Sequence, residues 1–392
     1  MVQQRTAGDS NNAPVSGCPF AAIIKATAPA VAPQTRAIVD DFYPRLFRQN
    51  PETKAFFNQS NQFSEQPTQR MALANAVVAY ASNIDSLENL TGAVKLIANK
   101  HCGLGVEPEH YGIVHKNLME SIGHVLGDVV TPEIGQGWSD AVLALAKVMY
   151  ETETELYKAA EQRTGGWRGK REFKITSIKS VTADCKEFTF EPADGSAMPI
   201  DFTPGQFLTL HLGKHSTEAT PRHYTVTNAP GKPFLQCCIK RVEKGLISNL
   251  MHRLEEGAIV ELSPPFGVFN LKPERKCVLI SAGIGATPMK CFLDSAKDNV
   301  ELLVHVDKNA EAHPFLDQVK ASGVNTEFLY TAERPRPSAE EVAELVKQKG
   351  LTDCDCYLCG PPAFLTGVKA SLAEVGVQNV FIDVFGPELS LA

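Results

Sequence analysis

Apolar residues recur with helical spacing over the first two-fifths of the chain. Residues three or four positions apart lie on one face of a helix. Such stripes run through four segments, which are 69–82, 91–101, 109–126 and 137–157. Alternating, strand-like patterns are absent between about 19 and 160. We therefore predict an all-α domain over 19–160.

The pattern changes at 161–172 (EQRTGGWRGKRE), where glycines interrupt a charged stretch. Such a stretch ends a helix and is typical of a linker. Over 173–273, short strand-like runs such as GQFLTLHL at 205–212 are separated by turn residues. This pattern of short strands and turns predicts a small antiparallel β-barrel.

Over 275–392, apolar runs of strand length alternate with helical segments. This alternation predicts an α/β domain with a doubly wound parallel sheet. The expected strands lie near 277–281, 300–306, 326–331, 355–359 and 379–384, and the expected helices near 288–297, 311–322, 338–349 and 362–375.

Length and composition agree with this division. At roughly 150 residues per domain, 392 residues accommodate three domains after a polar extension over 1–18. A net charge of -7 argues against a nucleic-acid binder. No apolar run reaches the roughly 20 residues of a membrane helix, and no signal-peptide core is present. We expect a monomeric, cytoplasmic protein without a membrane span.

The ten cysteines are expected to be reduced thiols, because a chain of this size builds its core without disulfides. Cys354, Cys356 and Cys359 are close in sequence, but no second ligand pair follows at metal-site spacing. We interpret them as part of a buried strand that ends in a turn.

A glycine turn follows the first strand of the α/β domain. Two glycines between a strand and a helix let the backbone approach a pyrophosphate, which then faces the positive helix N-terminus. An ordinary glycine turn is the alternative. The candidate phosphate-binding residues are Gly283, Ile284, Gly285, Ala286, Thr287 and Pro288.

Further motifs occur in a fixed order around this turn. They are Pro204-Gly-Gln-Phe207, Arg222-His-Tyr224-Thr225, Gly245-Leu-Ile-Ser248, Cys359-Gly-Pro361 and Phe385-Gly386-Pro387. In order and spacing the series resembles the ferredoxin–NADP reductase superfamily over roughly 170–392. The resemblance implies a flavin barrel followed by a nicotinamide domain.

The same resemblance implies roles for single residues. Arg222 would hold the FAD pyrophosphate, Tyr224 would pack on the isoalloxazine, and Cys359 would lie beside the hydride path. The remaining residues implied to contact FAD or NAD(P)H are Phe207, Thr225, Ser248, Asp383, Val384, Phe385, Gly386 and Pro387.

Three polar residues lie on apolar stripes of the helical domain: His101, Tyr111 and Glu155. Buried polar groups need partners, so these three are expected to satisfy one another. A lone histidine in such a place is otherwise a core or surface residue. The sequence CxxCH is absent, which excludes covalent c-type haem.

Three segments of the chain resemble the globin domain of flavohaemoglobins: 41–62, 98–114 and 153–167. The resemblance extends over about 19–392. It implies that His101 is the proximal haem ligand, supported by Tyr111 and Glu155. It places Tyr43, Phe57, Gln69 and Leu73 around the distal haem pocket, and Lys100 and Asp383 near the haem–flavin junction.

The activity implied is that of a nitric oxide dioxygenase, in which NAD(P)H reduces FAD, FAD reduces haem b, and NO is oxidised by O₂ to nitrate. Two alternatives remain. One is a sensor or carrier of O₂ or NO, and the other is a diaphorase-like reductase of quinones or ferric chelates. The choice between NADH and NADPH stays open, with Lys308 as a candidate contact for a 2′-phosphate.

Overall fold

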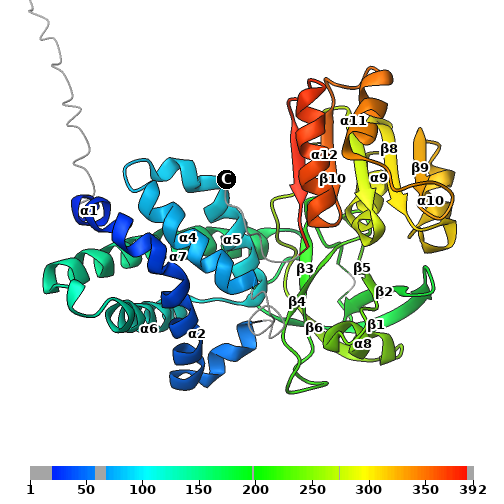
Figure 1. The fold of residues 1–392 in the computed structure, drawn as a ribbon. Coiled ribbons are helices and arrows are strands. Elements are labelled where there is room, and N and C mark those ends of the chain that lie inside the picture. The colour runs from blue at the N-terminus through cyan, green and yellow to red at the C-terminus, as the bar shows by residue number, and fades with distance from the viewer. Residues whose placement is uncertain (1–19, 58–67, 197, 273, 386–392) are drawn as a thin grey trace, which may run out of the picture.

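The computed structural model describes residues 20–57, 68–196, 198–272 and 274–385, except for the side chains of Thr68, Gln69 and Met71. It contains a helical unit, an antiparallel barrel and a parallel α/β unit (Figure 1). The predicted fold class is confirmed in all three parts. The extension over 1–18 lies outside the described residues.

The helical unit holds six α-helices among the described residues. They are α1 (Ala21–Val31), α2 (Thr35–Gln49), α4 (Thr68–Ser82), α5 (Thr91–Leu104), α6 (Pro108–Leu126) and α7 (Pro132–Gln162), with short 3₁₀ turns at 32–34, 51–56, 87–90 and 127–129. Their apolar stripes meet in one core that includes Phe42, Leu46 and Trp138. The Trp138 indole donates to Thr27 at 3.0 Å, which ties α7 to α1.

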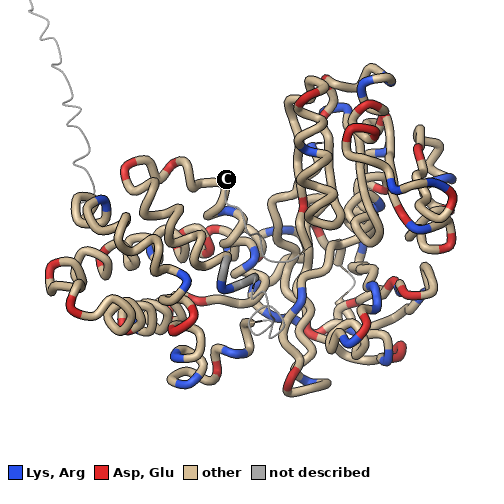
Figure 2. The backbone as a smooth tube through the Cα atoms, in the orientation of Figure 1, with Lys and Arg blue, Asp and Glu red and all other residues tan. Residues whose placement is uncertain are grey.

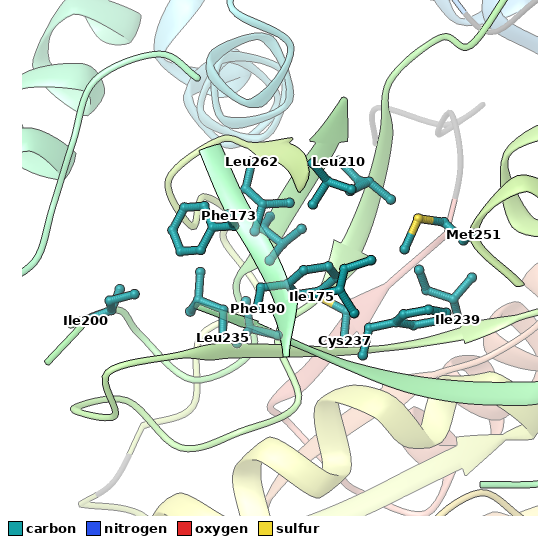
Figure 3. Close-up of a cluster of buried hydrophobic side chains, with 14 of the residues drawn as sticks. Phe173, Ile175, Phe190, Ile200, Leu210, Leu235, Cys237, Ile239, Met251 and Leu262 are labelled. Carbon is teal, nitrogen blue, oxygen red and sulfur yellow. The ribbon is translucent and has the colours of Figure 1, made fainter. Parts of the chain in front are cut away.

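The barrel is a six-stranded sheet in the order β4-β3-β6-β1-β2-β5. Its elements are β1 (Arg171–Ser180), β2 (Cys185–Pro192), β3 (Phe207–His211), β4 (Arg222–Thr225), β5 (Leu235–Lys240), α8 (Leu246–Arg253) and β6 (Ile259–Leu262). A bridge between Val226 and Cys237 closes the sheet between β4 and β5. Phe173, Phe190 and Leu262 fill the interior (Figure 3).

The α/β unit is a five-stranded parallel sheet in the order β11-β10-β7-β8-β9. The strands are β7 (Cys277–Ala282), β8 (Val300–Asp307), β9 (Thr326–Tyr330), β10 (Asp355–Cys359) and β11 (Val380–Asp383). The helices are α9 (Ala286–Ala296), α10 (Leu316–Ser322), α11 (Ala339–Gln348) and α12 (Pro362–Glu374). Residues of α9 and α10 pack in one core beside the sheet, and residues of α11 and α12 pack in another. The helix expected over 311–322 begins only at Leu316, since Pro314 interrupts it.

The first two units are joined by a short connection. Helix α7 continues to Gln162 and β1 begins at Arg171, so only 163–170 lie outside regular elements. The Trp167 indole donates to the carbonyl of Leu262 at 3.2 Å and anchors this connection in the barrel. Basic and acidic residues are interspersed along the chain (Figure 2). None of the described helices is both long and apolar enough to cross a membrane.

Candidate functional site

His101 lies on α5 within a polar cluster formed with α6 and α7. Its Nδ1 is 2.8 Å from Oε1 of Glu153 and 3.1 Å from the Tyr111 hydroxyl. That hydroxyl donates to the same Oε1 at 2.5 Å. Because a carboxylate only accepts hydrogen bonds, Nδ1 carries a proton that it donates to Glu153, and Nε2 is the nitrogen not engaged by this cluster. The half-buried imidazole therefore offers one nitrogen to a ligand.

The carboxylate in this cluster belongs to Glu153, so the assignment of Glu155 was wrong. Glu153 is 2% exposed, whereas the Glu155 side chain is 73% exposed and pairs with Lys158 on the surface. Successive buried residues of α7 are Met149, Glu153 and Tyr157. The stripe predicted over 137–157 advanced by fewer residues per turn than the 3.6 of an α-helix. It had therefore rotated off the buried face by Glu155.

Tyr111 is held as a neutral phenol. Burial, together with the charge of Glu153, raises its pKa well above the usual range. Its proton therefore stays on the hydroxyl and is directed at Oε1 of Glu153. The second carboxylate oxygen, Oε2, is buried and has no hydrogen-bond partner among the described residues. The carboxylate charge is thus shared by the imidazole and the phenol alone.

Three of the four residues expected around the distal pocket lie in one apolar cluster. Buried Tyr43 on α2 packs edge-on against Phe57, with ring centroids 5.6 Å apart. Leu73 on α4 joins the same core, and the Arg70 guanidinium lies 5.9 Å from the Tyr43 ring centroid. Gln69 belongs to α4, but its side chain lies outside the description.

The expected flavin residues meet on β3 and β4. In the register of these strands, Phe207 pairs with Thr225, Leu208 with Tyr224 and Leu210 with Arg222. Arg222 and Tyr224 therefore share one face of β4, and Thr225 lies on the other.

Hydrogen bonds hold the Arg222 side chain, since its guanidinium donates to the Thr220 hydroxyl at 2.8 Å. Burial raises the pKa of the Tyr224 phenol. Ser248, in the first turn of α8, is buried and accepts from the amide of Val242 at 3.1 Å.

The glycine turn lies at the carboxyl edge of the parallel sheet. Gly283–Gly285 form a 3₁₀ turn after β7, and α9 begins at Ala286, with Thr287 and Pro288 in its first turn. A Cβ on Gly285 would collide with the carbonyl of Cys359, so only glycine fits here. The turn therefore packs directly against the end of β10.

Cys359 and Asp383 lie opposite each other in the register of β10 and β11. Cys359 is fully buried, and burial raises the pKa of its thiol. After β11, Val384 is half-buried and Phe385 is 46% exposed. Gly386 and Pro387 lie outside the described residues. Cys356 and Cys359 belong to a buried strand, as predicted.

Several polar residues between the helical unit and the barrel were not singled out from the sequence. Buried Asn99 and His211 each form a hydrogen bond between the helical unit and the barrel. Half-buried His223 contacts Thr209 within the barrel. Burial, together with the charge of Lys100, lowers the pKa of His223 to about 3. A pattern along one chain does not reveal which residues meet across two units.

Comparison with known proteins agrees with this geometry. The globin family profile matches residues 40–149, and the oxidoreductase FAD-binding domain profile matches residues 172–271. A flavohemoprotein of Rhodopirellula baltica is 36% identical over 94% of this chain and 97% of its own, and one of Bacillus subtilis is 35% identical with the same coverage. The crystal structure of a Malassezia yamatoensis flavohemoglobin with bound FAD and heme is 25% identical and covers 94% of this chain and 98% of its own, with a TM-score of 0.78. The chain belongs to the flavohaemoprotein family of oxidoreductases.

Proposed function

We propose that the protein is a nitric oxide dioxygenase that oxidises NO with O₂ to nitrate at the expense of NADH. In balance, two NO, two O₂ and one NADH give two nitrate ions, NAD⁺ and one proton. The observation that carries the proposal is the contact of His101 Nδ1 with buried Glu153 and with Tyr111. Such a contact makes an imidazole more electron-donating, which favours O₂ activation over O₂ storage.

The proximal residues fit a haem group. His101 has one ring nitrogen bonded within the protein and leaves Nε2 for iron, as a proximal ligand requires. When bound, haem supplies one-electron iron chemistry toward O₂, and FAD converts a hydride into single electrons. The globin profile and the heme of the Malassezia relative support this assignment. Glu153 and Tyr111 keep the imidazole oriented and hold the proton at Nδ1.

On the distal side, Tyr43, Phe57 and Leu73 form an apolar wall. Such a wall excludes water from a site where NO and O₂, both small and apolar, react. We assign Tyr43 as the hydrogen-bond donor to the oxygen substrate. Gln69 remains a prediction for the same pocket.

The barrel residues fit a flavin with a pyrophosphate. A guanidinium held at a fixed angle suits bidentate phosphate binding, and Arg222 is held in this way by Thr220 and Pro221. Tyr224 lies on the same face of β4 as Arg222 and supplies an aromatic ring. Thr225 and Phe207 lie opposite each other on β4 and β3. The FAD-binding profile supports this role.

The α/β unit fits a dinucleotide, with Gly283–Pro288 facing its pyrophosphate. Asp307 ends β8, beside β7, about 20 residues after the glycine turn, where an acidic side chain binds a ribose 2′-hydroxyl. Its Oδ1 accepts from the amide of Lys308 at 2.7 Å, and its Oδ2 is 3.2 Å from Nε2 of His305. A fixed carboxylate repels a 2′-phosphate, so we infer a preference for NADH over NADPH.

The experiment uses the full chain loaded with haem and FAD. With NADH and O₂, NO is expected to disappear from an NO electrode, and nitrate is expected to accumulate in equal amount. The Tyr111→Phe variant is expected to turn over more slowly while keeping its O₂ affinity. A carrier would show normal O₂ binding but no sustained NO consumption, and that result would refute the proposal.

A further inference from the structure

Helix α5 has two functional faces. One carries His101 toward Glu153 and Tyr111. The other carries Asn99 and Gly103, one turn apart, and packs on the barrel strand β3 (Figure 1). The helix that holds the proposed haem ligand is therefore the same helix that contacts the strands proposed to hold the flavin.

Two buried hydrogen bonds fix this helix to the barrel. Oδ1 of Asn99 accepts from the amide of Gly267 at 2.8 Å. Nε2 of His211, at the end of β3, is 3.2 Å from the carbonyl of Gly103. Both side chains are more than nine-tenths buried. A buried polar group that loses its partner destabilises the protein, so these bonds resist sliding of the helix along the strand.

The contact at Gly103 leaves no room for a side chain. A Cβ at this position would collide with Oγ1 of Thr209 and lie 3.3 Å from the rings of His223 and Phe207. Thr209 cannot rotate freely, because its Oγ1 is 2.8 Å from Nδ1 of His223. The His223 ring in turn packs on Phe207 with centroids 4.4 Å apart. The backbone of α5 thus rests directly on a fixed cluster of the barrel.

An apolar cluster extends this contact. Cys102 and Tyr157 of the helical unit pack with Phe266 of the barrel, and Phe207 joins them. The Tyr157 and Phe266 rings meet edge to face at 6.1 Å. The boundary is therefore packed like a domain interior, and its position is set by shape as well as by hydrogen bonds.

We propose that Asn99, Gly103 and Thr209 are positioning residues that set the approach of the haem-bearing helix to the flavin-bearing strands and thereby the rate of electron transfer between them. The inference rests on the proposed cofactors. NADH gives the flavin two electrons and one proton as hydride, and solvent gives a second proton. The electrons then leave singly, each reducing ferric iron to ferrous, and both protons return to solvent.

The test compares Gly103→Ala with variants that restore the space. Thr209→Ala removes the colliding oxygen, whereas Thr209→Ser retains it. Gly92→Ala is the matched control, because Gly92 lies on the same helix with open space around it. The collision must displace either the helix or the barrel cluster, and electron transfer slows as the distance between the two proposed cofactors grows.

In stopped-flow measurements without NO, Gly103→Ala is expected to slow reduction of the haem by flavin several-fold. Reduction of the flavin by NADH should keep its rate. The double variant with Thr209→Ala should recover most of the loss, the double variant with Thr209→Ser should not, and Gly92→Ala should behave as wild type. Since NO is absent, failure of the dioxygenase proposal would not alter these rates.

Hydrogen exchange gives a second measurement that does not depend on activity. The amides of 99–104 and 207–211 are expected to exchange faster in Gly103→Ala and in Asn99→Ala, and to be protected again in the Gly103→Ala/Thr209→Ala variant. Unchanged haem reduction in Gly103→Ala, or equal rescue by Ala and Ser at position 209, would overturn the proposal.

Discussion

Two of the histidine–carboxylate pairs among the described residues differ in the state of the histidine's second ring nitrogen. In the helical unit, His101 Nδ1 is 2.8 Å from Glu153. In the α/β unit, His305 Nε2 is 3.2 Å from Asp307, and its Nδ1 is 2.8 Å from the Ser281 hydroxyl. Both nitrogens of His305 are thus occupied, whereas His101 has one left. The His305 side chain is 0% exposed and that of His101 is 32% exposed.

The comparison shows what separates a ligand histidine from a structural one. A carboxylate partner is common to both pairs and therefore does not identify a site. The ring of His313 also covers His305, because the two rings stack with their centroids 3.8 Å apart. An accessible ring nitrogen opposite a bonded one is the property that only His101 has of these two, and it is the property that a metal requires.

The largest expected effect comes from removing His101, whose second ring nitrogen is left for a ligand. His101→Ala should lose haem and lower NO consumption more than about 100-fold, since even loss of a supporting residue costs 10–100-fold. His305→Ala should keep haem but lose about 1–3 kcal/mol of unfolding free energy, because Ser281 and Asp307 lose a buried partner. Haem absorbance and urea unfolding measure the two outcomes.

The same pair of variants tests the diaphorase alternative. If His101→Ala kept its full physiological turnover, the helical unit would be dispensable and the reductase alone would carry the function. Haem loss from His305→Ala would show instead that the two histidine sites are not separate.

The next effect concerns the carboxylate on the proximal side. Glu153→Gln keeps the shape but removes the charge opposite His101 Nδ1, so turnover should fall about 10–100-fold. Glu155→Gln is the matched control on the same helix, since Glu155 is exposed, and it should behave as wild type. Steady-state NO consumption measures both. Equal losses would mean that α7 presents a different face to His101.

The two glutamates also show how much of the fold and of the site could be predicted from the sequence. Helical and strand periodicity predicted all three folds and the positions of the parallel strands, because periodicity follows directly from backbone geometry. The apolar stripes led to His101 and Tyr111, which the structure brings within hydrogen-bond distance. The stripe over 137–157 missed Glu153 by two residues, because an error of a few degrees per residue accumulates along a helix of 31 residues.

The contact between α5 and β3 was beyond such reasoning for a different reason. Asn99 and Gly267 are far apart in sequence and meet only after two units have packed. Neither residue has a local signal, since an asparagine in a helix usually bonds its own backbone, as Asn99 also does to Lys95. Contacts between two units depend on both surfaces at once.

A smaller effect is expected at Asp307, the carboxylate that contacts His305. Asp307→Ser removes the charge beside the proposed ribose site, so the ratio of kcat/KM for NADPH to that for NADH should rise about tenfold, or about 1.4 kcal/mol. Ferricyanide reduction measures this ratio without involving haem. Lys308→Ala should change the ratio little, because Lys308 is exposed. A larger effect at Lys308 than at Asp307 would reverse the assignment.

The last effect concerns the acid stability of the stacked histidines and is felt only below about pH 6.5. Burial lowers the pKa of His313 to about 3, helped by the charges of His305 and Lys320, and its Nδ1 is 3.0 Å from the Tyr330 hydroxyl. An unfolded imidazole titrates near 6.5. Between pH 6.5 and about 3 the unfolded chain binds a proton that the folded chain refuses, so the unfolding free energy should fall by about 1.4 kcal/mol per pH unit from this group. His313→Gln should flatten that fall in urea unfolding, and an unchanged slope would show that the stacked pair is not the source of acid sensitivity.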